Sequence, residues 1–164
     1  MISKTYADFA WEQAAAILAV DSPTGFTANA ARWAKDAFET LGYAASITTK
    51  GGVLADLGGK DDADALLLEA HTDTLGGMVR EIKGTGCLKL TNLGGMDANN
   101  AEAENVRVHT RGGRVIEGTC QLHDPSIHVN GSYRDTKRTW DAMEIVLDED
   151  VKTAEDARNL GIEV

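Results

Sequence analysis

A histidine and an aspartate stand two residues apart, directly after a nearly continuous apolar run. His71 and Asp73 follow Ala65 to Ala70, in which only Glu69 is charged. A neutral imidazole offers one ring nitrogen to a zinc-like ion while its other nitrogen donates a hydrogen bond, and a nearby carboxylate holds the ring in place. We therefore consider His71 a candidate metal ligand and Asp73 its supporting carboxylate. The alternative is a hydrogen-bonded His71 beside an Asp73 that caps a turn or helix, and the spacing alone does not exclude it.

The elements before this pair have the patterns of an α/β layer. Apolar residues recur at helical spacing from Ser3, a potential N-cap, to Val20, and again from Thr27 to Gly42, with Trp11 and Trp33 expected in the core. The β-prone stretches 45–49 and 53–57 flank Lys50-Gly51-Gly52 and predict a hairpin. The apolar run 65–70 predicts a central strand that is covered on both faces.

Beyond residue 75 the chain changes to short β-type segments joined by glycine-rich turns. Strands are expected at 77–83, 87–92, 105–110, 114–121 and 143–147, and Thr153 to Asp156 resembles a capping box before a brief helix that ends at Gly161. We therefore predict an α/β fold in two domains. Residues 1–75 form an incomplete α/β layer of two helices and about three strands, and residues 76–164 form a β-rich, barrel-like domain.

Composition narrows the classes of partner. The 164 residues carry a net charge of −10, which disfavours binding to a phosphate backbone, so no nucleic acid partner is expected. Cys87 and Cys120 show no metal or redox spacing, and we expect both to be reduced. The apolar stretch Ala14 to Val20 is too short to cross a bilayer, so we expect a soluble, cytoplasmic protein with no membrane partner.

The sequence resembles the M42 family of metallo-aminopeptidases, the group of glutamyl aminopeptidase and tetrahedral aminopeptidase. The matching segments keep their order and spacing over most of the chain, and they are Asp21 to Gly25, Lys50 to Gly59, Glu69 to Gly76, Leu93 to Gly95, Gly112 to Gly118, Pro125 to His128 and Asn159 to Ile162.

The resemblance implies a zinc-peptidase α/β domain interrupted by an inserted β-barrel that builds subunit contacts, with a two-metal site for zinc or cobalt. Peptides are the implied substrates. Within the family pattern, His71 matches the first metal-ligand histidine and Asp73 matches the catalytic-site residue that steadies it. A metal-polarised carbonyl and a bridging water, deprotonated by a glutamate, are the implied chemistry.

The sequence also departs from that pattern. Family members are longer, and their bridging aspartate, general-base glutamate and remaining ligands follow the inserted domain. One histidine and one aspartate cannot hold two divalent ions, so we expect this chain alone to be inactive. Thr74 stands where many relatives carry an acidic residue, which leaves the substrate preference open.

The other histidines and one tryptophan have alternative interpretations. His123, Asp124 and His128 are a possible second metal site, or the loop from Pro125 to His128 packs against a neighbouring subunit. His109 falls on a predicted strand. Trp140, near several basic residues, is a candidate interface anchor.

Three functional hypotheses follow. The first is a portion of an aminopeptidase whose activity requires further residues. The second is a non-enzymatic assembly module that associates through the β-rich half, and the third is a related two-metal deacylase or carboxypeptidase. Because an unfinished α/β layer leaves apolar surface uncovered, we also expect a homo-oligomer or a rearranged segment 1–70.

Overall fold

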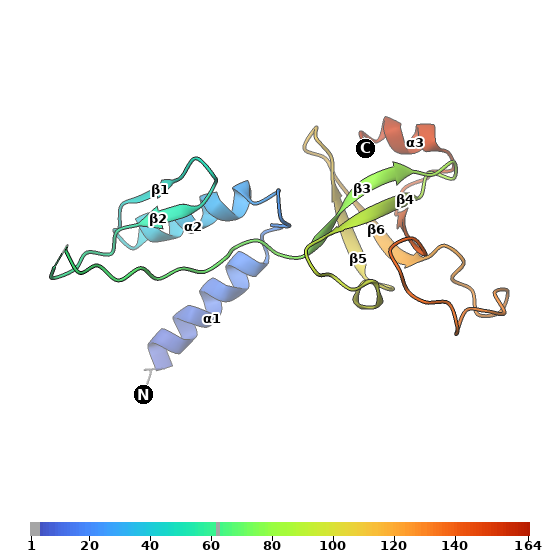
Figure 1. Cartoon of the computed structure of the whole chain (residues 1–164). Helices are drawn as coiled ribbons and strands as arrows, with labels where there is room; N and C mark the ends of the chain where they lie inside the picture. Colours follow the sequence, from blue (N-terminus) through green and yellow to red (C-terminus); the bar gives the residue numbers. More distant parts are fainter. Residues whose placement is uncertain (1–3, 62) are drawn as a thin grey trace. The chain divides into compact units, whose positions relative to one another are not determined.

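A computed structural model describes residues 4–61 and 63–164, and the chain divides into two compact units (Figure 1). We refer to residues 1–75 as the N-terminal unit and to residues 76–164 as the C-terminal unit. The N-terminal unit contains α1 (Lys4–Leu18), α2 (Ala28–Thr40), β1 (Ala45–Ile47) and β2 (Val53–Ala55). The C-terminal unit contains β3 (Gly76–Ile82), β4 (Leu88–Leu93), the short 3-10 helix η1 (Ala98–Asn100), β5 (Asn105–His109), β6 (Val115–Leu122), β7 (Met143–Leu147) and α3 (Ala154–Asn159).

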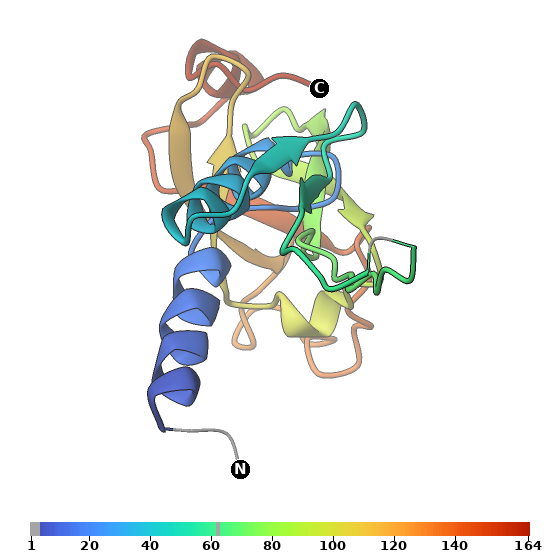
Figure 2. The same ribbon diagram turned by 90° about the vertical axis from the view of Figure 1, so that its left-hand side faces the viewer.

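The two predicted helices and the hairpin of the N-terminal unit are confirmed. Thr27 is the N-cap residue of α2, and Gly42 follows its last turn with a φ of 90°, a left-handed conformation that glycine adopts without strain. β1 and β2 pair antiparallel, with Ala45 opposite Ala55, and α2 packs against both strands (Figure 2). The expected N-cap Ser3 lies outside the described residues.

The predicted central strand at residues 65–70 is wrong. The segment has no strand structure, and the side chains of Leu66, Leu67 and Leu68 are between 72% and 84% exposed. An apolar run becomes a central strand only where neighbouring strands pair with its backbone and other elements cover its faces. No strand of the described chain takes either position beside it.

The helix α1 also lacks the packing that its sequence predicts. None of its residues is buried, and Trp11 is 78% exposed, so the expected core position of this tryptophan is wrong. Trp33, on α2, is half-buried. The apolar stripe of α1 therefore faces solvent within the part of the chain that the structure describes. No helix there is long and apolar enough to cross a membrane.

The five strands of the C-terminal unit form one antiparallel sheet in the order β3-β4-β7-β6-β5, which curls as a half-barrel (Figures 1 and 2). Alternate residues of β6 are buried, as expected for a strand with one face on the core. The core is made by Leu88, Ile116, Cys120, Leu122, Met143 and Ile145, with smaller side chains around them. The α/β fold class with a β-rich second part is thus confirmed.

Polar contacts complete the C-terminal unit. Thr153 and Asp156 form the predicted capping box of α3. The carboxylate of Glu144 is buried on β7, and Lys83 Nζ lies 2.5 Å from its Oε2. The hydrogen bond from Lys83, together with the charge of Glu144, raises the pKa of this lysine. The buried carboxylate is therefore paired rather than isolated, and its attraction to Lys83 offsets part of the desolvation cost.

A long irregular connection, residues 123–142, is held to the rest of the C-terminal unit by Arg138. Its guanidinium makes a bidentate contact with Glu102, with Nε 2.8 Å from Oε2 and Nη2 3.0 Å from Oε1. Nη1 donates to the carbonyls of Tyr133 and Thr136, and the guanidinium stacks 4.7 Å from the centre of the Tyr133 ring. Trp140 Nε1 donates to Met96 O, and its side chain packs on the core. The structure thus places Trp140 in the packing of this unit.

Replacing Arg138 by lysine tests this attachment. An ammonium keeps the charge but cannot make the two parallel bonds to Glu102 and also reach both carbonyls. We expect Arg138→Lys to lose about 1–3 kcal/mol of stability and to be cut severalfold faster within residues 123–142 in limited proteolysis. The exposed Arg134, in the same connection, provides the control Arg134→Lys. Equal cleavage rates in the two variants would contradict the role of Arg138.

Candidate metal-ligand site

The predicted pair lies at the end of the N-terminal unit, where the exposed segment 65–70 leads into residues 71–74. The His71 side chain is 86% exposed and that of Asp73 is 42% exposed. His71 Nδ1 lies 2.9 Å from the main-chain oxygen of Asp73 and 3.3 Å from its carboxylate Oδ1. The two residues singled out by the sequence are therefore in direct contact.

Residues 22–24 contact residues 73 and 74 through main-chain and side-chain hydrogen bonds. Pro23 and Thr74 form an isolated parallel bridge. The Thr74 N–H donates to Ser22 O at 2.7 Å, and the Thr24 N–H donates to Thr74 O at 3.3 Å. In addition, the Thr24 hydroxyl donates to Asp73 Oδ2 at 2.8 Å. The bridge and the hydroxyl fix the main chain and the carboxylate of residues 73–74 to a segment that lies 49 positions earlier.

The contact with a carbonyl determines which ring nitrogen of His71 carries the proton. A main-chain oxygen only accepts hydrogen bonds, so the Nδ1 that contacts Asp73 O must be the donor. The lone pair of a neutral ring is then on Nε2. None of the hydrogen bonds among the described residues involves Nε2, so this nitrogen is accessible on an exposed ring. This is the tautomer that binds a metal through Nε2.

Asp73 is held in its ionised form. The hydrogen bond from the Thr24 hydroxyl, and then the proximity of His71, keep the pKa of the Asp73 carboxyl below its ordinary value of 3.8. An ionised carboxylate with one oxygen bonded to Thr24 keeps the other oxygen directed at the imidazole. The arrangement orients the ring.

A complete metal site is not assembled from the described residues. Nowhere among residues 4–61 and 63–164 do three or more His, Cys, Asp or Glu side chains gather in a way that could hold an ion. The possible second site at His123, Asp124 and His128 is therefore wrong. His123 Nδ1 instead lies 3.0 Å from Ala142 O, a contact that fastens residue 123 to the end of the same connection.

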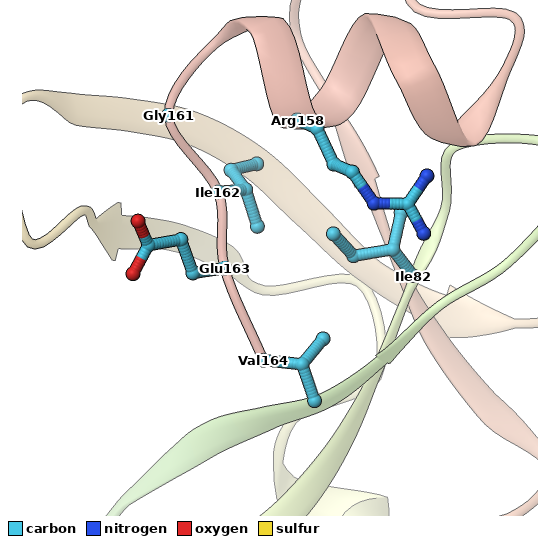
Figure 3. A pocket seen from close by; sticks show the side chains of 6 residues that line it. All are labelled: Ile82, Arg158, Gly161, Ile162, Glu163 and Val164. Atoms are coloured by element: carbon cyan, nitrogen blue, oxygen red, sulfur yellow. The ribbon is translucent and has the colours of Figure 1, made fainter.

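A separate cavity of about 460 Å³ lies in the C-terminal unit between β3 and the segment that follows α3 (Figure 3). Its lining residues are Ile82, Arg158, Gly161, Ile162, Glu163 and Val164. The Arg158 side chain reaches toward Ile82, whereas Glu163 points away and pairs with Arg111 at 3.0 Å. The lining includes no histidine or cysteine, so this cavity has no donor set for a transition metal.

The thiols are not part of a site either. Cys87 and Cys120 are both free, and Cys120 is buried in the core of the C-terminal unit. Burial raises the pKa of the Cys120 thiol to about 11. It is therefore a protonated, unreactive core residue at neutral pH.

Thr24 is the residue of this site to which the sequence assigned no role. The sequence marks Asp21 to Gly25 only as a segment that matches the family, because a threonine in a turn does not reveal a partner so far along the chain. A hydroxyl next to a proline and a glycine is an ordinary turn composition. The bridge between Pro23 and Thr74 brings the two segments together, and the hydrogen bond to Asp73 shows what this hydroxyl contacts.

Comparison with known proteins identifies the family. The sequence model of the M42 glutamyl aminopeptidase family matches residues 51–164. A protein of Bacillus subtilis (strain 168) named "Putative aminopeptidase YhfE" is 36% identical over 148 residues, which cover 90% of this chain and 43% of that protein. The chain thus spans less than half the length of this relative.

Solved structures show the same fold. A TET aminopeptidase from a marine sediment archaeon of the Thaumarchaeota superimposes with a TM-score of 0.78 at 22% identity, covering 97% of this chain and 43% of that one. The structure titled PhTET1-12s, a dodecamer in the asymmetric unit, gives a TM-score of 0.73 at 18% identity, covering 92% of this chain and 42% of that one. The fold of this chain is therefore that of the matching part of these two structures. The family model, which matches more than half of the residues, establishes that the chain belongs to the M42 family.

The proton position on His71 is directly measurable. We expect long-range ¹H–¹⁵N correlation spectra of the chain at a pH where the ring is neutral to show the Nδ1–H tautomer. Because the acceptor is a main-chain oxygen, the variant Asp73→Asn should keep this tautomer. His128, exposed in the C-terminal unit, serves as the reference ring. A predominant Nε2–H form of His71 would contradict the geometry.

Proposed function

We propose that this chain contributes one metal ligand and its orienting carboxylate to the active site of an aminopeptidase. His71 supplies Nε2 to a divalent ion, zinc or cobalt, and Asp73 steadies the ring from the opposite side. The observation that supports this most directly is the contact of Nδ1 with Asp73, which leaves Nε2 free on an exposed ring. Membership of the M42 family supplies the reaction class, the removal of N-terminal residues from peptides.

The described residues can supply only part of the ligands of such a metal site. An ion of this kind needs about four donors, and the described residues bring one imidazole to the position. When bound, the ion would polarise the scissile carbonyl of the substrate. We propose that the remaining ligands and the general base come from residues that this chain does not contain, and that the chain alone is therefore inactive. This chain's own part is to present His71 in one tautomer and one orientation.

The exposed segment 65–70 supports the same proposal. Its three consecutive leucines are typical of a buried strand, but their side chains are exposed to solvent in the described structure. The relatives are more than twice as long as the matched region, so their sequences include residues with no counterpart here. Strands from such residues would pair with segment 65–70 and, in doing so, bring further ligands to the carboxyl end of the strand beside His71.

A chimera tests the proposed activity. The matching region of the Bacillus relative is exchanged for residues 1–164 of this chain, so that the rest of the relative completes the site. We expect the chimera to release amino acids from aminoacyl chromogenic substrates in a chelator-sensitive reaction, and His71→Ala to lower kcat/KM by at least about a hundredfold. The isolated chain should show no turnover with zinc or cobalt.

The control for this experiment is Thr72→Ala, which truncates an exposed side chain next to His71 in the same chimera and should leave the rate unchanged. Chelator-sensitive turnover by the isolated chain would contradict the proposed division of the site. A folded, active chimera that tolerates His71→Ala would contradict the role of His71.

We further propose that the protein self-associates through the C-terminal unit, and that assembly without catalysis is the second candidate function of the chain. This unit has a closed core of its own, whereas α1 and segment 65–70 do not. The connection 123–142, fastened by Arg138, exposes Ile127 and Val129, with Val129 83% exposed. A related fold forms the dodecamer described above. The reduced cysteines agree with a cytoplasmic location.

Light scattering coupled to size exclusion tests the association. We expect the chain to be an oligomer at tens of micromolar and Val129→Asp to convert it to a monomer, because a buried charge in an apolar contact is costly. Leu66 is a matched control because it is 84% exposed in the N-terminal unit, and Leu66→Asp should leave the mass unchanged. A monodisperse monomer, or dissociation by Leu66→Asp alone, would contradict association through the C-terminal unit.

A further inference from the structure

The Asp73 carboxylate has two oxygens with different partners. Oδ2 accepts the hydrogen bond of the Thr24 hydroxyl at 2.8 Å, and Oδ1 lies 3.3 Å from His71 Nδ1. The carboxylate thus spans the space between a hydroxyl and an imidazole. Its position relative to the ring depends on the side-chain torsion of Asp73.

The main-chain contacts of this region do not fix that torsion. The bonds between residues 22–24 and Thr74 hold the backbone of residues 73–74, and the Asp73 carbonyl accepts from His71. None of these bonds involves the carboxylate. An aspartate on the surface exchanges between rotamers unless a partner holds it. Among the described residues, the contact with the Thr24 hydroxyl is the one that fixes the carboxylate from the side opposite the ring.

Thr24 is itself held rigidly. Residues 23–26 form a β-turn that is closed by the Phe26 N–H donating to Pro23 O at 2.7 Å. Gly25 follows Thr24 with a φ of 89°, as the third residue of a type II turn requires. The Thr24 N–H is bonded to Thr74 O at the same time. The backbone that carries the Thr24 hydroxyl is therefore fixed both by the turn and by the bond to Thr74.

We propose that Thr24 is a positioning residue for the metal ligand. Its hydroxyl selects the Asp73 rotamer that keeps the negative charge beside Nδ1, and this holds the His71 ring ready to bind through Nε2. The inference rests on the proposed function, since it assigns Thr24 to the site that His71 serves there. Thr24 does not contact the ion or the substrate and acts through Asp73.

Two substitutions of Thr24 and one control distinguish a positioning role of its hydroxyl from a purely structural role. Thr24→Val removes the hydroxyl and keeps the β-branched shape, whereas Thr24→Ser keeps the hydroxyl. Thr72, exposed and next to His71, provides the control Thr72→Val. In the metal-free chain, three-bond couplings from ¹⁵N and ¹³C′ to ¹³Cγ of Asp73 report its χ1 rotamer. We expect a single rotamer in the parent, Thr24→Ser and Thr72→Val, and averaged couplings in Thr24→Val.

The second measurement is zinc affinity of the chimera by competition with a chromophoric chelator. We expect Thr24→Val to bind zinc about tenfold more weakly, the lower end of what outer partners of metal ligands contribute, with Thr24→Ser near the parent value. Unchanged couplings in Thr24→Val, or averaged couplings with unchanged zinc affinity, would overturn the role of Thr24. Zinc retained in the His71→Ala chimera would overturn the proposed function instead, so the two failures are distinguishable.

Discussion

The arrangement around His71 depends on the connection between residues 22–24 and residues 73–74. The segment that carries the histidine is exposed on either side and has no strand pairing of its own. The parallel bridge at Pro23 and Thr74 closes a long loop, and the Thr24 hydroxyl adds a charge-assisted bond to Asp73. Without this connection, the imidazole would have neither a fixed backbone nor a fixed carboxylate. The geometry of the candidate ligand is thus determined by a turn distant in sequence.

The two units of the chain differ in how much of their own apolar surface they bury. In the C-terminal unit, five strands and α3 enclose a core in which Leu88 and Ile145 are almost completely buried. In the N-terminal unit, α1 and the leucines of segment 65–70 remain exposed. We therefore propose that the C-terminal unit is stable by itself and supports assembly, whereas the N-terminal unit becomes functional when further residues cover it. Folding and completion of the metal site would then be one event.

Local patterns predicted most of the fold. Alternating burial along β6, the capping box at Thr153 and the glycine at the end of α2 each depend on neighbours in sequence, and each is found where the pattern places it. The resemblance to the M42 family is confirmed by the family model. The structure places His71 and Asp73 in contact, whereas their spacing alone left open whether Asp73 supports the ring or caps a turn.

The sequence did not predict the features that depend on residues far apart in the chain. The run 65–70 has the composition of a buried strand, but composition does not say whether the strands that must pair with it are present. The bond between Thr24 and Asp73 and the clamp of Arg138 on Glu102 join residues far apart in the chain, and neither has a local signal. The helical spacing of apolar residues in α1 predicted both a helix and a buried face. The helix forms from local backbone hydrogen bonds, but burial of its apolar face requires partners elsewhere in the structure, and no residue of α1 is buried.

We propose above that His71 binds a divalent ion through Nε2 while Asp73 holds Nδ1. A crystal structure of the zinc-loaded chimera, with an anomalous difference map at the zinc edge, tests it most directly. The account predicts a zinc peak about 2.0–2.1 Å from His71 Nε2, with Nδ1 still donating to Asp73. A zinc ion bound elsewhere, with the His71 ring turned away from it, would contradict the account.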